Sequence, residues 1–150
     1  MNKIDARTSP GYEEDFAQWS EDQAAFLRAG AFDRLDLENL AEEIESLGRS
    51  DRQQIASRLT VILTHLLKWQ FQPEKRTNSW LASIMNNRDA IAGLIEESPS
   101  LRRYPGTVLA RAYRSAPLAA SGETELPLSV FPTTCPYSIE QVLDPDYLPQ

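Results

Sequence analysis

The sequence holds one cysteine, one histidine, two methionines and no long apolar run. A lone cysteine, Cys135, cannot form a disulfide within the chain, which excludes a disulfide-stapled secreted scaffold. No stretch approaches the ~18 apolar residues of a membrane span, and the first residues lack the apolar segment of a secretory signal. We therefore expect a soluble protein of the reducing cytoplasm that does not associate with membranes.

The sequence also lacks the short motifs that assign an enzyme class. There is no GxxxxGK[ST] phosphate loop, no GxGxxG, no HExxH zinc motif, no GxSxG nucleophile motif and no CxxC pair. A nucleophilic role for Cys135 with His65 as base would lack a third, orienting group, and a buried structural thiol is the simpler interpretation. We expect no resident cofactor and favour a protein that is not an enzyme.

The composition is that of one ordinary globular domain: 150 residues, 41% hydrophobic and 25% charged. The net charge of -7 argues against broad binding of nucleic acid, which usually requires a basic excess. The charge is uneven along the chain. Residues 11–48 carry eleven acids and two bases, a net charge of -9, whereas residues 49–114 carry eleven bases and five acids, a net charge of +6.

Apolar residues recur every three or four positions through the first half of the chain, which is the period of amphipathic helices. The pattern predicts a helix over residues 12–29, followed by Gly30 as its C-terminal cap. A second helix carries an apolar stripe and is expected to stop at Gly48. Its stripe consists of Leu37, Leu40, Ile44 and Leu47.

A third, central helix is predicted to open at Ser50, which forms a capping-box pattern with Gln53, and to end before Pro73. Its core positions are Ile55, Leu59, Ile62, Leu66 and Trp69. A fourth helix is expected from about Thr77 to Glu97. A fifth starts after Ser98 and carries a kink or break near each of Pro105 and Pro117.

Eight of the ten prolines lie at or beyond Pro99, which makes long helices improbable toward the C-terminus. The predicted fold is all-α, a bundle of about five helices with a Pro-rich C-terminal tail that carries a short helix at about 138–143. We expect a single domain over residues 1–150. It comprises an N-terminal extension over 1–11, a helical core over 12–126 and a docking tail over 127–150.

Several segments together resemble a known family. They are YEEDFAQWSEDQ at 12–23, LDLENLAEEIESLGRSDR at 35–52, Ser79–Trp80, ESPSL at 97–101, Glu123–Thr124 and FPTTCPYSIEQVLD at 131–144. In these segments the chain is similar to the bacterial family called domain of unknown function 29, over about residues 12–149. The resemblance implies a small, mostly helical bacterial protein, and it transfers no catalytic residue.

His65 is the only histidine and lies on one flank of the predicted central helix. If the second and third helices form an antiparallel pair joined at Gly48, then Glu43, Arg58 and His65 lie close to one another. The first interpretation is a polar cluster that fixes the register of two helices, because a half-buried charge needs a partner. The alternative is a metal-binding or acid-base site, with Glu43 and His65 as the candidate catalytic residues.

Two groups of cations are candidates for anion binding. Lys68, Lys75 and Arg76 alternate with aromatic residues, a pattern that grips phosphates while bases stack on rings. Arg102 and Arg103 follow a helix start, whose free amides attract anions. The competing interpretation of both groups is structural: core aromatics flanked by lysine stems, and a solvated basic face.

The leading functional hypothesis is a non-catalytic module that acts by protein interaction, with another protein or with a second copy of itself as the partner. Its basis is the charge segregation and the tail rich in aromatic residues and prolines. A metal-assisted hydrolase or nuclease that uses Glu43 and His65 is the first alternative. Binding of anions or nucleic acid through the basic middle segment is the second, although nucleic acid is not expected as the partner.

Overall fold

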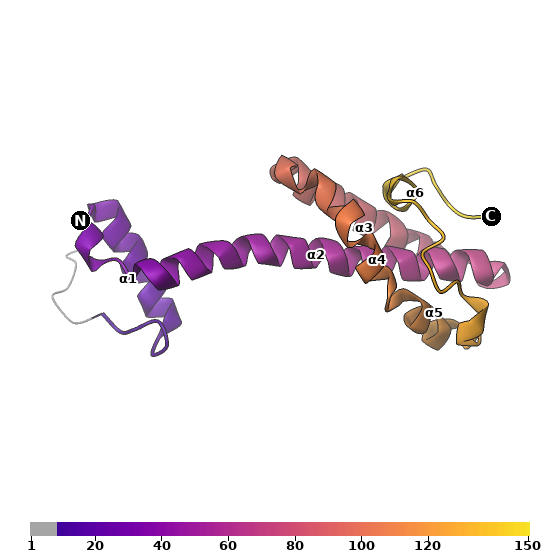
Figure 1. Cartoon of the computed structure of the whole chain (residues 1–150), viewed down its shortest axis with the longest axis horizontal. Helices are drawn as coiled ribbons and strands as arrows, with labels where there is room; N and C mark the ends of the chain where they lie inside the picture. The colour runs from indigo at the N-terminus through magenta and orange to yellow at the C-terminus, as the bar shows by residue number, and fades with distance from the viewer. Residues whose placement is uncertain (1–8) are drawn as a thin grey trace. The chain divides into compact units, whose positions relative to one another are not determined.

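The computed structural model describes residues 9–150, and this part of the chain forms α-helices and short 3-10 turns with no strand (Figure 1). The predicted all-α class is therefore confirmed. The helices are α1 Phe16–Ala29, α2 Leu37–Phe71, α3 Asn78–Glu97, α4 Tyr104–Tyr113, α5 Ala116–Thr124 and α6 Ile139–Leu143. The 3-10 turns are η1 Phe32–Arg34, η2 Pro73–Lys75, η3 Pro99–Arg103 and η4 Leu128–Val130. Most of the predicted N-terminal extension, residues 1–8, lies outside the described residues.

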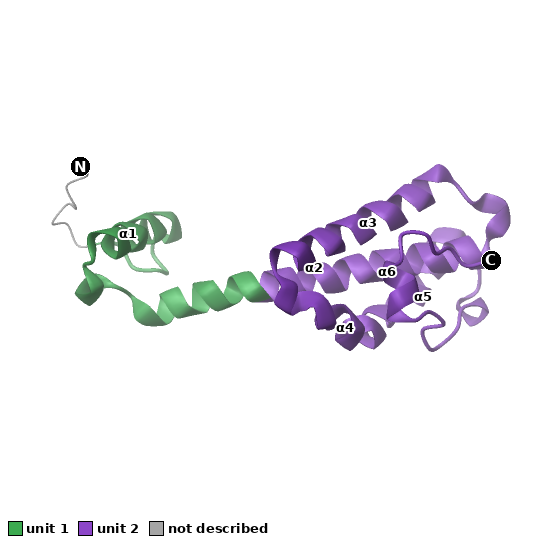
Figure 2. Ribbon diagram, turned by 90° about the horizontal axis from the view of Figure 1, so that it is seen from above, with its two compact units in different colours: residues 1–48 green, residues 49–150 purple. Residues whose placement is uncertain are grey.

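The chain divides into two compact units, residues 1–48 and 49–150 (Figure 2). Unit 1 contains α1, η1 and the first turns of α2, and unit 2 contains the remaining elements. The single domain expected from the sequence stays a prediction, because a compact unit is not by itself a unit of folding.

The predicted break at Gly48 is wrong, since residues 48–50 are helical and α2 runs without interruption from Leu37 to Phe71. One glycine inside a helix costs only about 1 kcal/mol relative to alanine. Strong helix formers on both sides, such as Leu47 and Arg49, outweigh that cost. Ser50 and Gln53 accordingly lie within the helix and form no capping box at its start.

The other predicted helix ends are confirmed to within a few residues. Gly30 closes α1 in the left-handed conformation, at a φ of 70°, where its backbone N–H donates to the Leu27 carbonyl. Thr77 caps α3 through its side chain, and α2 ends before Pro73. Pro105 and Pro117 each occupy the first turn of a new helix, α4 and α5, where proline is tolerated because its missing N–H would have no partner.

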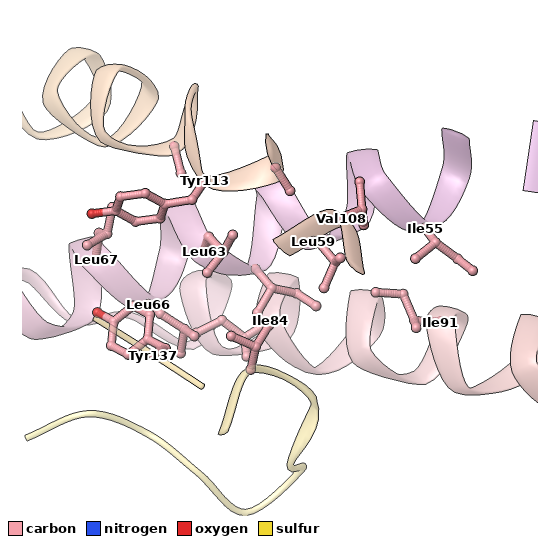
Figure 3. Close-up of a cluster of buried hydrophobic side chains, with 14 of the residues drawn as sticks. Ile55, Leu59, Leu63, Leu66, Leu67, Ile84, Ile91, Val108, Tyr113 and Tyr137 are labelled. Atoms are coloured by element: carbon pink, nitrogen blue, oxygen red, sulfur yellow. The ribbon is translucent and has the colours of Figure 1, made fainter. Parts of the chain in front are cut away.

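The core of unit 2 is built around the second half of α2, as Figure 3 shows. Six side chains there have no exposed surface: Ile55, Leu59, Ile62, Leu63, Leu66 and Leu67. Ile84 and Ile91 from α3 and Val108 from α4 belong to the same buried cluster. The segment predicted to be the central helix, now the second half of α2, is therefore central to the core of unit 2.

The C-terminal tail docks on this core, as predicted. Phe131, Tyr137 and Val142 are buried in the cluster, and a full capping box between Ser138 and Gln141 starts α6. The buried Tyr113 hydroxyl donates to the Pro132 carbonyl at 2.6 Å, which joins α4 to the tail. Burial raises the pKa of Tyr113 to about 12, and it raises the pKa of Tyr137 as well.

Truncating Leu59, Ile62 or Leu66 to alanine is expected to lower the free energy of unfolding by about 2–5 kcal/mol each, because every removed group leaves a cavity in a closed core. Urea unfolding followed by circular dichroism measures the loss. A loss below about 1 kcal/mol at all three positions would contradict the central place of α2.

The tyrosine burial predicts a loss of stability in alkali. An unfolded tyrosine titrates near pH 10, so a folded pKa of about 12 contributes stability that is fully present below pH 10 and is lost as the pH rises toward 12. Urea unfolding at several pH values between 9 and 12 should show this decline. Tyr113→Phe should make the decline shallower; an unchanged pH dependence in that variant would refute the assignment.

Candidate interaction surface

Unit 1 is an antiparallel helical hairpin made by α1 and the first turns of α2. The Trp19 indole Nε1 donates to an Asp36 carboxylate oxygen at 3.1 Å, and the Tyr12 hydroxyl donates to Glu43. Tyr12 comes before Trp19 in the chain, whereas its partner Glu43 comes after Asp36, the partner of Trp19. The two segments therefore run in opposite directions. Trp19 and Phe26 are the buried large apolar residues among positions 9–48.

Asp36 organises this hairpin at the start of α2. Its carboxylate accepts from the Asn39 side-chain amide at 2.8 Å, and its backbone N–H donates to the Gln23 side-chain oxygen at 2.8 Å. The hydrogen bond from Asn39 lowers the pKa of Asp36, although desolvation acts in the opposite direction. These bonds fix the orientation of α2 relative to α1 within unit 1.

Unit 1 exposes an unusual amount of apolar surface. It contributes six of the ten large hydrophobic side chains that are exposed among residues 9–150, although it holds less than a third of those residues. On α2, Leu37, Ile44 and Leu47 are 69%, 68% and 71% exposed. The others are Phe16, Leu27 and Phe32. Single exposed apolar residues are common in proteins, but a contiguous apolar patch marks an interaction site.

Five of these side chains fall on one side of the hairpin. At 100° per residue, four of the exposed residues follow the packed residues of their helix in the same rotational sense by roughly 50–110°, and Leu47 follows them by about 30°. In an antiparallel pair, residues that are rotated from the contact line in the same sense on both helices lie on the same side of the hairpin. We call this side the apolar face; it consists of Phe16 and Leu27 on α1 and Leu37, Ile44 and Leu47 on α2.

Acidic side chains lie on α2 away from the apolar face. By the same rotation, Glu38, Glu42 and Glu45 are more than 90° from the centre of the α2 stripe. Three of the eleven acids in residues 11–48 therefore lie off the apolar face and do not interrupt it.

The structure does not bring the predicted polar cluster together, because the turn that would have paired two helices is absent. Glu43 accepts from Tyr12 in unit 1, whereas Arg58 donates to the Asn87 side-chain oxygen at 3.2 Å in unit 2. His65 is partly exposed, with its Nδ1 2.8 Å from the Val61 carbonyl oxygen of the preceding turn. No three or more His, Cys, Asp or Glu side chains form a possible metal-binding group within the described part of the chain.

Two of the three cations that alternate with aromatic residues, Lys68 and Arg76, contact other side chains or backbone groups of unit 2. The Lys68 ammonium is 2.9 Å from Glu123 and lies over the Trp80 ring, and the Lys68 side chain is buried. The Arg76 guanidinium lies over Trp69 and donates to the Trp69 carbonyl. Lys75 is exposed on η2. Lys68 and Arg76 therefore both make contacts within unit 2.

Arg102 and Arg103 are both exposed on η3. Arg102 lines a cavity of about 430 Å³ together with Arg88 and Leu143, at the side of α3. Cys135 is partly buried, its thiol donates to the Tyr137 carbonyl at 3.4 Å, and burial raises the pKa of the thiol. A raised pKa keeps the thiol protonated, which fits a structural cysteine.

A comparison with known protein families identifies the family of this chain. The sequence model of the family described as Domain of unknown function DUF29 matches residues 12–148. The chain belongs to the DUF29 family. No curated protein and no solved structure gives a significant match to it. None of the described helices of this DUF29 chain is long and apolar enough to cross a membrane.

Sequence reasoning missed one residue that fastens the tail of this DUF29 chain. Arg88 is only 4% exposed, and its guanidinium donates to the backbone carbonyls of Val142, Gln141 and Tyr147 at 2.8, 3.2 and 2.9 Å. Burial lowers the pKa of Arg88, but an arginine keeps its charge. The signal was present: Arg88 interrupts the apolar stripe of α3 between Ile84 and Ile91.

Replacing Arg88 by methionine should release the tail, because three carbonyls lose a charged donor while the apolar stem is kept. We expect the free energy of unfolding to fall by about 3–5 kcal/mol, since each bond to a charged group contributes about 1.5–3 kcal/mol and the losses are not additive. Hydrogen exchange measures the release as faster exchange at residues 139–143. Arg103→Met is the matched control at an exposed position and should change neither quantity; protected tail amides in Arg88→Met would contradict the role.

Proposed function

We propose that this protein is a non-catalytic interaction module of the bacterial cytoplasm, in which unit 1 binds a protein partner through its apolar face. Unit 2 supplies a closed core with a fastened tail. The observation that carries the proposal is the exposure of Leu37, Ile44 and Leu47 on one stripe of α2. A partner that covers this stripe removes apolar surface from water, which is the main driving force of protein association.

The hydrogen bonds around Asp36 support this function because they preorganise the surface. A partner meets a hairpin whose two helices are already joined by Trp19 and Gln23 contacts to Asp36. Binding then requires little ordering of the backbone, and less of the association energy is lost as conformational entropy. The cytoplasmic location is part of the proposal and rests on the single cysteine.

Site-specific photocrosslinking in the native cells tests the function. A photoreactive p-benzoylphenylalanine residue at position 44 should give discrete covalent protein adducts after irradiation, because Ile44 lies within the proposed binding surface. The same residue at position 118 is the control, since Leu118 is 66% exposed but belongs to α5 of unit 2. Adducts from both positions in equal amounts, or from neither, would refute a binding surface on unit 1.

A further inference from the structure

We propose that the apolar face of unit 1 binds a second copy of the same chain, so that two α1–α2 hairpins form a four-helix bundle. This inference rests on the proposed function, because it names the partner of the same face. The pair would have two-fold symmetry, with the same patch used on both copies.

The size of unit 1 is the first argument. Its described part spans only 40 residues, from Ser9 to Gly48, and contains two buried large apolar side chains, Trp19 and Phe26. Units of about this size usually need a disulfide, a metal or a second chain to be stable. The only cysteine is in unit 2, and the described part of the chain holds no possible metal-binding group of three or more ligands. A second hairpin supplies the missing half of a bundle core.

The exposed apolar area of the face is a large part of what a dimer interface needs. Full exposure of a Leu, Ile or Phe side chain shows on the order of 100 Å² of apolar surface. The five side chains of the apolar face, at 49–71% exposure, then offer roughly 300 Å² per copy. A standard interface buries about 800 Å² per partner, of which a little more than half is apolar. The apolar face of each hairpin therefore supplies about two-thirds of the apolar area of a standard interface.

The spacing along α2 is self-complementary. Leu37, Leu40, Ile44 and Leu47 are separated by three, four and three residues, an order that reads the same in both directions. In an antiparallel pair, Leu37 of one copy lies beside Leu47 of the second copy, and Leu40 lies beside Ile44 of the second copy. Such spacing is that of the a and d positions of a helical seam.

Small residues and distant charges favour close approach of two α2 helices. Ala41 and Gly48 border the stripe on the side opposite to α1, so no bulky side chain holds the helices apart. Glu38, Glu42 and Glu45 lie off the seam. Each copy nevertheless carries a net charge of -9 over residues 11–48, so two copies repel one another over a distance that salt screens.

Sedimentation velocity over protein concentrations on the order of 1–100 µM measures the association of the full chain. We expect a monomer–dimer equilibrium that shifts toward the dimer as NaCl is raised, because salt screens the acid repulsion. The variant Ile44→Glu with Leu47→Glu should raise the dissociation constant at least ~100-fold. Leu118→Glu makes the same chemical change at a similarly exposed position of unit 2 and should leave it unchanged.

Two neighbouring cysteine positions test the geometry of the pair in a Cys135→Ser background. Ala41→Cys lies at the edge of the seam, one residue from the symmetry axis, and should form a disulfide-linked dimer on mild oxidation. Glu42→Cys lies on the opposite side of α2 and should form no disulfide-linked dimer under the same oxidation. Circular dichroism verifies that each variant keeps its helical content.

A monomer at every concentration and salt would overturn the inference, and so would a dimer that the double glutamate variant leaves intact. A dimer that weakens as salt rises would also overturn it, since that dependence indicates contact between acidic and basic segments. The photocrosslinking experiment separates this failure from failure of the proposed function. Adducts from position 44 whose partner is a different protein leave the function standing and refute the second copy as the occupant.

Discussion

The rest of the structure depends on the burial of the greater part of the surface of α2 in its second half. From Ile55 to Leu67, six side chains have no contact with solvent, and α3, α4, α5 and the tail supply the atoms that cover them. A helix that is apolar on several sides cannot remain at a surface, so the elements that follow it must surround it. This requirement explains why a tail with five prolines is ordered: Phe131, Tyr137 and Val142 close the last open side of the core.

The two halves of α2 have opposite environments although they form one helix. The buried cluster begins at Ile55, whereas among the described residues of unit 1 the start of α2 is joined to α1 and to Tyr12 just before it. A two-helix hairpin can enclose only the side on which its helices meet. Apolar residues elsewhere on its surface have to find cover in another molecule or remain in water. One helix therefore serves as a core element in one unit and as an exposed surface in the other.

Sequence periodicity predicted the helices well and the exposed face not at all. Periodicity reports that Leu37, Leu40, Ile44 and Leu47 share a stripe, but the same stripe results whether it packs inside the chain or on a partner. The error at Gly48 decided the outcome, because a turn there would have folded the stripe onto the central helix and brought Glu43 toward Arg58 and His65. A glycine inside a helix costs too little to stop it when its neighbours favour the helix. The capping box at Ser138 and the breaks at Pro105 and Pro117 were predictable because their causes are local.

The bonds by which Arg88 fastens the tail go to backbone carbonyls. Every amino acid at positions 141, 142 and 147 would present the same carbonyl, so evolution can change those residues without any compensating change at Arg88. The arginine itself has no such freedom, because no other side chain offers five donors in a planar fork. Across relatives, this contact should therefore appear as an arginine retained by itself, without a correlated partner position, and methods that infer contacts from paired substitutions would not detect it.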